Sequence, residues 1–151
     1  MEIVETKTEL CNYPVGENMH TNIPIIKDMT DAISGIKEFK NCSFNIICRG
    51  SSGAIIAAIM CTRIPTPCNI VHVKKPNEES HDSGLKLLPN RKNIIVDDFI
   101  GTGETMNAIY DKVTEWSRIW NTRLKIDAVC ISGIYKTSLK FEPKYFICSS
   151  K

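Results

Sequence analysis

One segment of the chain combines acidic, glycine and hydroxyl residues in an order that suits a sugar phosphate. Within residues 94–107, an apolar run ends in Asp97 and Asp98 and then continues through glycine and threonine into a helical pattern. Ionised carboxylates only accept hydrogen bonds, so this pair suits the adjacent hydroxyls of a ribose ring. Glycine turns and unpaired N–H groups at the start of a helix suit a phosphate. The segment therefore predicts a site for a ribose that carries a 5′-phosphate.

The residues around this segment alternate between strand-like and helix-like patterns. Short runs rich in Ile and Val predict buried strands, and longer amphipathic or apolar stretches predict helices. In chain order we expect a helix over 29–39, a strand over 44–48, a helix over 53–62, strands over 69–73 and 93–96, a helix over 104–120, and strands over 125–134 and 144–148. This alternation predicts a three-layer α/β fold, in which a mostly parallel central sheet has helices on both faces. Ligands of such sheets bind at the carboxyl ends of the strands, which is where Asp97 and Asp98 fall.

Length and charge limit the class of protein. The chain has 151 residues with 42% hydrophobic content, which fits a single domain over residues 1–151. Lys and Arg number 19 against 17 Asp and Glu, and the resulting net charge of +2 gives no long-range field for nucleic acid or a membrane. We therefore expect neither as a partner, and any phosphate must be recognised at a local site.

Cysteine usage and the first residues of the chain indicate a cytoplasmic protein. The 7 cysteines are an odd number without a C-x-x-C pair, so reduced thiols explain them best. The first residues lack the basic and apolar regions of a signal peptide, and no run approaches the roughly 18 apolar residues of a membrane span. The expected environment is a reducing cytoplasm.

The segment described first resembles the signature of type I phosphoribosyltransferases, in which an apolar strand, an acidic pair, two apolar residues and a small residue precede Thr-Gly-x-Thr. The resemblance implies that Asp97 and Asp98 hold the ribose hydroxyls of 5-phosphoribosyl 1-pyrophosphate. It also implies that residues 101–105 hold the 5′-phosphate. The residues of the segment implied in binding are Asp97, Asp98, Phe99, Ile100, Gly101, Thr102, Gly103, Glu104 and Thr105.

Two further segments fit the same family order, and the likeness extends over roughly residues 44–133. The turn after the first core strand, with Arg49, Gly50, Ser51 and Ser52, resembles the loop that holds the pyrophosphate group. After the next strand, Lys74 and Lys75 resemble the cationic pair that meets the pyrophosphate. The resemblance implies catalytic roles for Asp97, Asp98, Lys74 and Lys75.

The resemblance implies a transferase that moves a phosphoribosyl group to a nucleobase or a similar ring nitrogen and releases pyrophosphate. It implies Mg2+ as the cofactor, held by Asp97 and Asp98 through bound water, and it implies a homodimer. The family core would cover about 28–135, with a small hood built from residues 1–27 and 136–151. Two other interpretations stay open: a regulator that binds phosphoribosyl pyrophosphate without transferring it, and a nucleotide-binding scaffold without chemistry.

Two residues depart from the family pattern. Gly101 stands where hypoxanthine–guanine enzymes have an aspartate that handles a purine proton, and glycine cannot act as acid or base. The segment is closer to the adenine and orotate branches. Glu104 places a carboxylate beside the predicted phosphate site, where it repels an anion unless its side chain turns outward.

Overall fold

Six strands form one parallel sheet in the computed structural model, which describes residues 1–6, 23–74, 86–98, 100, 102–131 and 139–149. The elements of this part of the chain are β1 (Glu2–Thr6), α1 (Ile23–Gly35), the 3-10 helix η3 (Lys37–Phe39), β2 (Phe44–Cys48), α2 (Gly50–Arg63), β3 (Cys68–His72), β4 (Lys92–Val96), α3 (Glu104–Ile119), β5 (Ala128–Ile131) and β6 (Tyr145–Ser149). None of the helices in these residues is long and apolar enough to span a membrane.

The strand order β1-β6-β5-β4-β2-β3 reverses direction at β2. From β2 the chain crosses through α2 to β3 at one edge of the sheet, and β4 then pairs with the other side of β2. The register aligns Ile47 of β2 with Ile95 of β4, so their carboxyl ends lie next to each other. A crevice opens outside the carboxyl ends of the strands at such a reversal, because the two crossover helices cover opposite faces.

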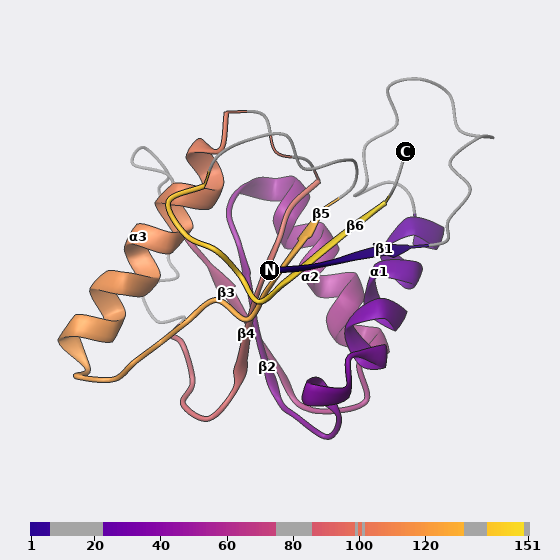
Figure 1. Cartoon of the computed structure of the whole chain (residues 1–151), viewed down its shortest axis with the longest axis horizontal. Helices are drawn as coiled ribbons and strands as arrows, with labels where there is room; N and C mark the ends of the chain where they lie inside the picture. The colour runs from indigo at the N-terminus through magenta and orange to yellow at the C-terminus, as the bar shows by residue number, and fades with distance from the viewer. Residues whose placement is uncertain (7–22, 75–85, 99, 101, 132–138, 150–151) are drawn as a thin grey trace.

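The helices form two outer layers, and each covers its own hydrophobic core (Figure 1). α1 and α2 pack against one face through Met29, Ile56 and Met60, among others. α3 covers the other face with Met106, Ile109 and Val113. Successive strand residues point to opposite faces, so neighbours such as Ile94 and Ile95 belong to different cores. The predicted three-layer α/β class is confirmed.

Most of the predicted elements are confirmed to within three residues at each described end. The first helix is the exception, because it covers Ile23–Gly35 and not 29–39. Its apolar face begins earlier, at Ile25 and Ile26, and Pro24 suits the first turn, where its missing N–H is not needed. Phe39 belongs to η3, which follows after Gly35 has ended the helix.

Both ends of the described chain contribute strands to the sheet: β6 confirms the strand predicted over 144–148, whereas β1 was not predicted. β1 and β6 fall within the ranges assigned to a hood, yet β1 pairs with β6 and β6 with β5 (Figure 1). The sequence pattern did not predict β1, because two glutamates interrupt its short run of apolar and β-branched residues. The remaining parts of the predicted hood, 7–22, 136–138 and 150–151, lie outside the described residues.

The amino ends of β2, β3 and β4 carry asparagines that bond to one another; Asn45 and Asn93 are buried, and Asn69 is half-buried. Asn69 Nδ2 donates to Asn45 Oδ1 at 3.0 Å, and Asn45 Nδ2 donates to Asn93 Oδ1 at 2.8 Å. This amide ladder (Asn45, Asn69 and Asn93) also takes backbone groups of residues 86–88: Asn45 Oδ1 accepts from Leu88 N at 3.1 Å, and Asn69 Nδ2 donates to the Lys86 carbonyl at 2.8 Å. The ladder therefore fixes the segment that leads into β4.

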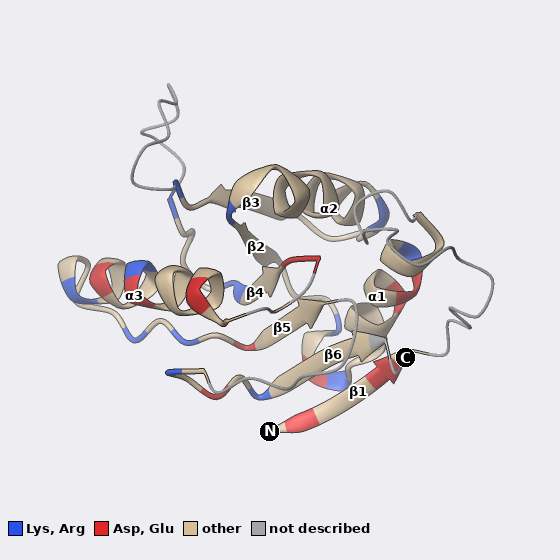
Figure 2. Cartoon of the chain, turned by 90° about the horizontal axis from the view of Figure 1, so that it is seen from above, with Lys and Arg blue, Asp and Glu red and all other residues tan. Residues whose placement is uncertain are grey.

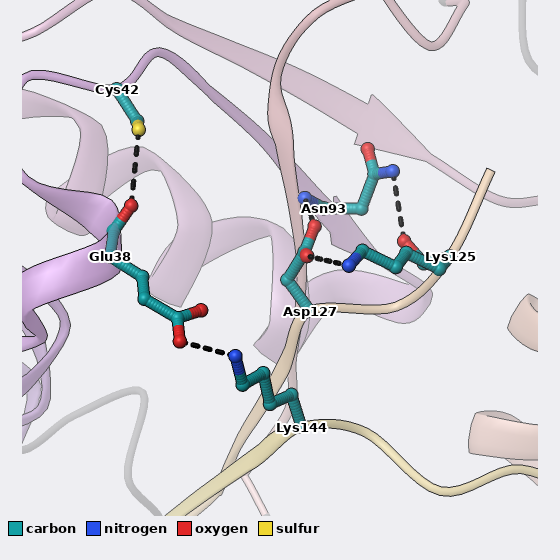
Figure 3. Close-up of polar contacts among 6 residues, drawn as sticks. All are labelled: Glu38, Cys42, Asn93, Lys125, Asp127 and Lys144. Carbon is teal, nitrogen blue, oxygen red and sulfur yellow. Dashed lines mark hydrogen bonds and ion pairs between the residues drawn. The ribbon is translucent and has the colours of Figure 1, made fainter.

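A buried carboxylate extends the polar contacts of this edge toward β5. Asp127 Oδ2 accepts a hydrogen bond from Asn93 N at 2.8 Å, and the exposed Lys125 ammonium lies 3.8 Å from Asp127 Oδ1 (Figure 3). Farther along the edge, Lys144 pairs with Glu38, which links β6 to η3. The same pairing lowers the pKa of Glu38, mainly through the hydrogen bond from Lys144.

Candidate active site

Two loops meet at the carboxyl edge of the sheet, at the reversal between β2 and β4. The Arg49 loop, as we call Arg49 together with the first turn of α2 (residues 49–53), follows β2, and the second loop leads from Asp97 into α3. Acidic residues are visible in the loop that follows β4 and at the start of α3 (Figure 2). Because β2 and β4 are paired, segments separated by about 50 residues in the chain come together.

A cavity of about 320 Å³ lies between these loops. Its lining is polar for the most part and consists of Arg49, Gly50, Ser51, Ser52, Asp97, Asp98, Ile100, Thr102, Gly103, Glu104, Thr105 and Met106. Arginine and three carboxylates are its charged groups, and backbone N–H groups of two helix starts add further donors. A cavity with this mixture suits a ligand that has both hydroxyls and anionic groups.

The Arg49 loop needs glycine at two places. Gly50 has φ of 83°, a left-handed conformation that residues with a Cβ rarely adopt. A Cβ at Gly53 would lie 3.1 Å from Cys48 Cβ and 3.4 Å from the Val96 carbonyl oxygen. The absence of a side chain at Gly53 therefore lets the first turn of α2 approach the ends of both β2 and β4.

The second loop repeats this construction at the start of α3. Gly103 also has φ of 83°, and it precedes the helix without a side-chain cap. The hydroxyl of Thr102 accepts a hydrogen bond from Glu104 N at 3.3 Å, and the Gly103 carbonyl accepts one from Asn107 N at 2.9 Å. α2 likewise begins without a side-chain cap, at Arg49. Two helix N-termini, each with positive potential, therefore border the same cavity.

The two adjacent acids differ in burial. Asp97 is buried, with 8% of its surface exposed, whereas Asp98 is half-buried. Asp97 Oδ1 accepts a hydrogen bond from Asp98 N at 2.8 Å, and Asp97 N donates to the Cys130 carbonyl at 3.1 Å. The sheet therefore fixes the backbone of Asp97, and both acids line the cavity.

Cys48 ends β2 beneath this site but is not suited to act as a nucleophile. Burial, and then the negative charge of Asp97, raise the pKa of its thiol to about 12. At neutral pH the thiol is therefore protonated, and a thiol is a poor nucleophile compared with a thiolate. The six described cysteines are all free, which agrees with the expectation of reduced thiols, and Cys11 lies outside the described residues.

Arg49 has a hydrogen-bond donor without a partner among the described residues. Its Nε atom is buried and has no hydrogen-bond partner among the residues that the structure describes. Leaving a buried donor of a charged group unpaired is costly, so such groups usually have a partner. Since Arg49 lines the cavity, an anionic ligand is the natural partner for it.

The structure brings together most of the residues predicted for the site. Eleven predicted residues line the cavity: Arg49, Gly50, Ser51, Ser52, Asp97, Asp98, Ile100, Thr102, Gly103, Glu104 and Thr105. Met106 was missed, although it directly follows the motif, because its spacing assigned it to the core face of the helix. Lys74 lies half-buried after β3 and is not part of the lining. Lys75, Phe99 and Gly101 lie outside the described residues.

Comparisons with known proteins identify the fold. No family model matches the sequence, and no curated protein has a significantly similar sequence. Among solved structures, a hypoxanthine-guanine-xanthine phosphoribosyltransferase matches with a TM-score of 0.56 and 14% identity, over 95% of this chain and 79% of the other. A hypoxanthine phosphoribosyltransferase from Staphylococcus aureus matches with a TM-score of 0.57 and 15% identity, over 93% of this chain and 82% of the other. The chain therefore has the fold of the type I phosphoribosyltransferases.

Proposed function

We propose that this protein is a phosphoribosyltransferase, an enzyme that moves the phosphoribosyl group of 5-phosphoribosyl 1-pyrophosphate to a ring nitrogen of a nucleobase. The observation that carries the proposal is the single cavity that unites the Arg49 loop with Asp97 and Asp98. The fold and the names of the similar structures support it. In the reaction, the nitrogen lone pair forms a bond to C1 of the ribose. The bond from C1 to the pyrophosphate oxygen breaks, and pyrophosphate leaves with the electron pair.

Each part of the cavity has a role in this proposal. Asp97 and Asp98 accept hydrogen bonds from the two ribose hydroxyls, which orients C1. The phosphate cup (residues 101–105) binds the 5′-phosphate with N–H groups at the start of α3. The Arg49 loop binds the pyrophosphate group, for which the Arg49 guanidinium supplies positive charge. Lys74 and Lys75 remain candidates for stabilising the leaving pyrophosphate.

Mg2+ fits the donor set of this cavity when the substrate supplies further ligands. Magnesium is usually bound by one or two carboxylates together with phosphate oxygens and water. Asp97 and Asp98 provide the carboxylates, and neither the Arg49 loop nor the phosphate cup offers competing soft ligands. When bound, the ion would neutralise charge on the departing pyrophosphate.

A regulator that binds phosphoribosyl pyrophosphate without transferring it is the second candidate. The position of Lys74 favours this alternative, because its side chain is not part of the cavity lining. A transferase needs positive charge near the leaving group, and Arg49 is the one cationic side chain among the described lining residues. A regulator that only binds the ligand needs less positive charge than a transferase, because no additional negative charge develops on a departing pyrophosphate.

One experiment distinguishes the two candidates. The protein is incubated with phosphoribosyl pyrophosphate, Mg2+ and single bases, namely adenine, orotate, hypoxanthine and guanine. Binding is measured by calorimetry and pyrophosphate release by a coupled assay. Release with one of the bases supports the transferase, binding without release supports the regulator, and failure to bind contradicts both. From Gly101 we expect adenine or orotate to be a better acceptor than hypoxanthine or guanine.

The proposal extends to assembly and location. We propose a homodimer that works in the cytoplasm, in line with the resemblance of the sequence to type I phosphoribosyltransferases. Light scattering in the presence of the substrate tests the assembly. A monomeric mass at concentrations that support activity would contradict the dimer.

A further inference from the structure

Glu104 is an acidic side chain at the place where the proposed function requires an anion to bind. It is the first residue of α3, its side chain is exposed, and it lines the cavity beside Thr102, Gly103 and Thr105. Its neighbours provide what a phosphate needs, namely hydroxyls and a helix start without a side-chain cap. Glu104 therefore lies beside the place where the proposed function puts the 5′-phosphate.

The start of α3 attracts both the Glu104 carboxylate and the phosphate of a ligand. A helix N-terminus has positive potential, and an acidic side chain in the first turn is stabilised by it. Glu104 is the acidic residue of the first turn of α3. A phosphate bound to the same turn interacts with the same N–H groups, so the two anions repel each other and compete for one positive end.

We propose that Glu104 sets the affinity of the site for the 5′-phosphate, because it acts as an internal anion that competes for the start of α3. This inference rests on the proposed function and adds to it a residue that determines affinity. In the ligand-free protein, Glu104 stabilises α3. With ligand bound, it weakens the hold on any product or substrate that carries a 5′-phosphate. The Arg49 loop belongs to a different helix start, so pyrophosphate binding is affected less.

Removing the charge of Glu104 should strengthen phosphate binding but weaken the ligand-free helix. A purely structural role of Glu104 would predict only the second effect. Glu104→Gln keeps the size of the side chain and removes its charge. We expect the variant to bind ribose 5-phosphate about three- to tenfold more tightly at low salt, and this gain to shrink at high salt as charges are screened. The ligand-free variant should melt at a slightly lower temperature, since the helix loses a favourable charge.

The experiment uses the full-length protein and two simple probes. Ribose 5-phosphate reports on the phosphate cup, and inorganic pyrophosphate reports on the Arg49 loop. Both are titrated by calorimetry at low and high salt, and melting is followed with and without ribose 5-phosphate. Glu115→Gln is the matched control: it makes the same charge change on the same helix, about 16 Å farther along the axis. The control should change the affinity for ribose 5-phosphate by less than about twofold.

Each outcome decides the proposal. Tighter binding of ribose 5-phosphate by Glu104→Gln, with little change for pyrophosphate and none in the control, supports it. Equal or weaker binding of ribose 5-phosphate by Glu104→Gln overturns it while the proposed function stands. An equal gain for both probes, or an equal gain in Glu115→Gln, overturns it as well, since net charge would then be the cause. If the wild-type protein binds neither probe, the proposed function fails with it.

Discussion

The two edges of the parallel sheet differ in how far the hydrogen-bonding groups of the protein are satisfied by one another. At the amino edge, the amide ladder satisfies its side chains with one another and with the backbone of residues 86–88. At the carboxyl edge, α2 and α3 begin without side-chain caps, and Arg49 Nε has no partner among the described residues. The side chains of the amide ladder find their partners within the protein, whereas the carboxyl edge presents donors to a cavity.

This difference separates polar residues that stabilise the fold from those available to a ligand. Asn45 is fully buried, and its side chain makes four hydrogen bonds, two within the amide ladder and two to Leu88, so its polar atoms contribute to stability. Groups of the cavity retain hydrogen-bonding capacity that a substrate can use. Changes at the two edges should therefore affect different measurements, stability at one and binding at the other.

The largest effect is expected from replacing both acids of the cavity. Asp97→Asn together with Asp98→Asn keeps the shape of the side chains but removes two negative charges and replaces one acceptor oxygen of each carboxylate by an NH2 donor. We expect the turnover of phosphoribosyl pyrophosphate to fall by about 10³-fold, the scale at which electrostatic stabilisation in active sites is lost. Steady-state kinetics measure this loss, and melting curves should show a nearly unchanged fold. Normal binding by the double variant would remove Asp97 and Asp98 from the ribose site.

Substitutions in the amide ladder at the amino edge should lower the free energy of unfolding. Asn45→Leu removes four hydrogen bonds: Leu88 N and Asn69 Nδ2 lose an acceptor, and the Leu88 carbonyl and Asn93 Oδ1 lose a donor. Unpaired buried groups cost about 1–3 kcal/mol each, so we expect the free energy of unfolding to fall by about 3 kcal/mol or more. Urea denaturation measures the change.

A variant at the rim of the ladder serves as the control for Asn45. Asn69 belongs to the edge strand β3 and is half-buried, so water can replace its bonds in Asn69→Leu. We expect a loss of only about 1 kcal/mol for this variant. Equal losses at both positions would show that the buried ladder is not the cause.

Arg49 tests the other half of the comparison. Arg49→Met keeps the apolar stem and removes the guanidinium, including the buried Nε that lacks a partner in the described residues. We expect the affinity for pyrophosphate to fall about tenfold, as one charge-assisted contact is lost. The melting temperature should stay the same or rise. A clear loss of stability would assign Arg49 to the fold and weaken the contrast between the edges.

Replacing the glycine at the start of α3 should have a smaller effect on the free energy of unfolding. Gly103→Ala introduces a Cβ at φ of 83°, and the left-handed conformation costs an L-residue about 1–2 kcal/mol. Denaturation measures this cost. Gly35→Ala provides a matched control of opposite sign, because a Cβ there would meet no atom within 4 Å. The control should be neutral or stabilising by up to about 1 kcal/mol.

The smallest effect is expected from an exposed lysine that pairs with a buried carboxylate at the amino edge. The Lys125 side chain is 75% exposed and lies 3.8 Å from Asp127, whose other oxygen is bonded to Asn93 N (Figure 3). Lys125→Met should change the free energy of unfolding by less than about 0.5 kcal/mol, because water screens the charge of this exposed ammonium and Asp127 keeps its bond to Asn93 N. A loss comparable with that of Asn45→Leu would show that charge, and not the hydrogen bonds, secures this edge.

Local patterns were enough to predict the class of fold and most of the site. The apolar runs of β2 and β4 and the periodic faces of α2 and α3 depend on neighbours in the sequence, so their positions could be predicted. The acids after β4, the glycines and the threonines form one continuous segment. These residues could therefore be predicted as one candidate site from their order alone.

Contacts between distant residues could not be predicted in the same way. β1 has one strand neighbour, β6, which lies about 140 residues later in the chain, and nothing in residues 2–6 specifies that partner. The asparagines of β2, β3 and β4 look like polar interruptions of apolar strands until the register places them side by side. Likewise, the sequence could not show that Lys74 lies apart from the cavity lining.

By itself, the sequence determined which segments carry the residues of the candidate site, because turn geometry and helix starts are set by neighbouring residues. Only the tertiary structure decided which of those segments meet. The pairing of β2 with β4 joins the Arg49 loop to Asp97 and Asp98, and the same pairing aligns the amide ladder at the opposite edge. Strand pairing depends on the packing of the whole sheet, which no short stretch of residues contains.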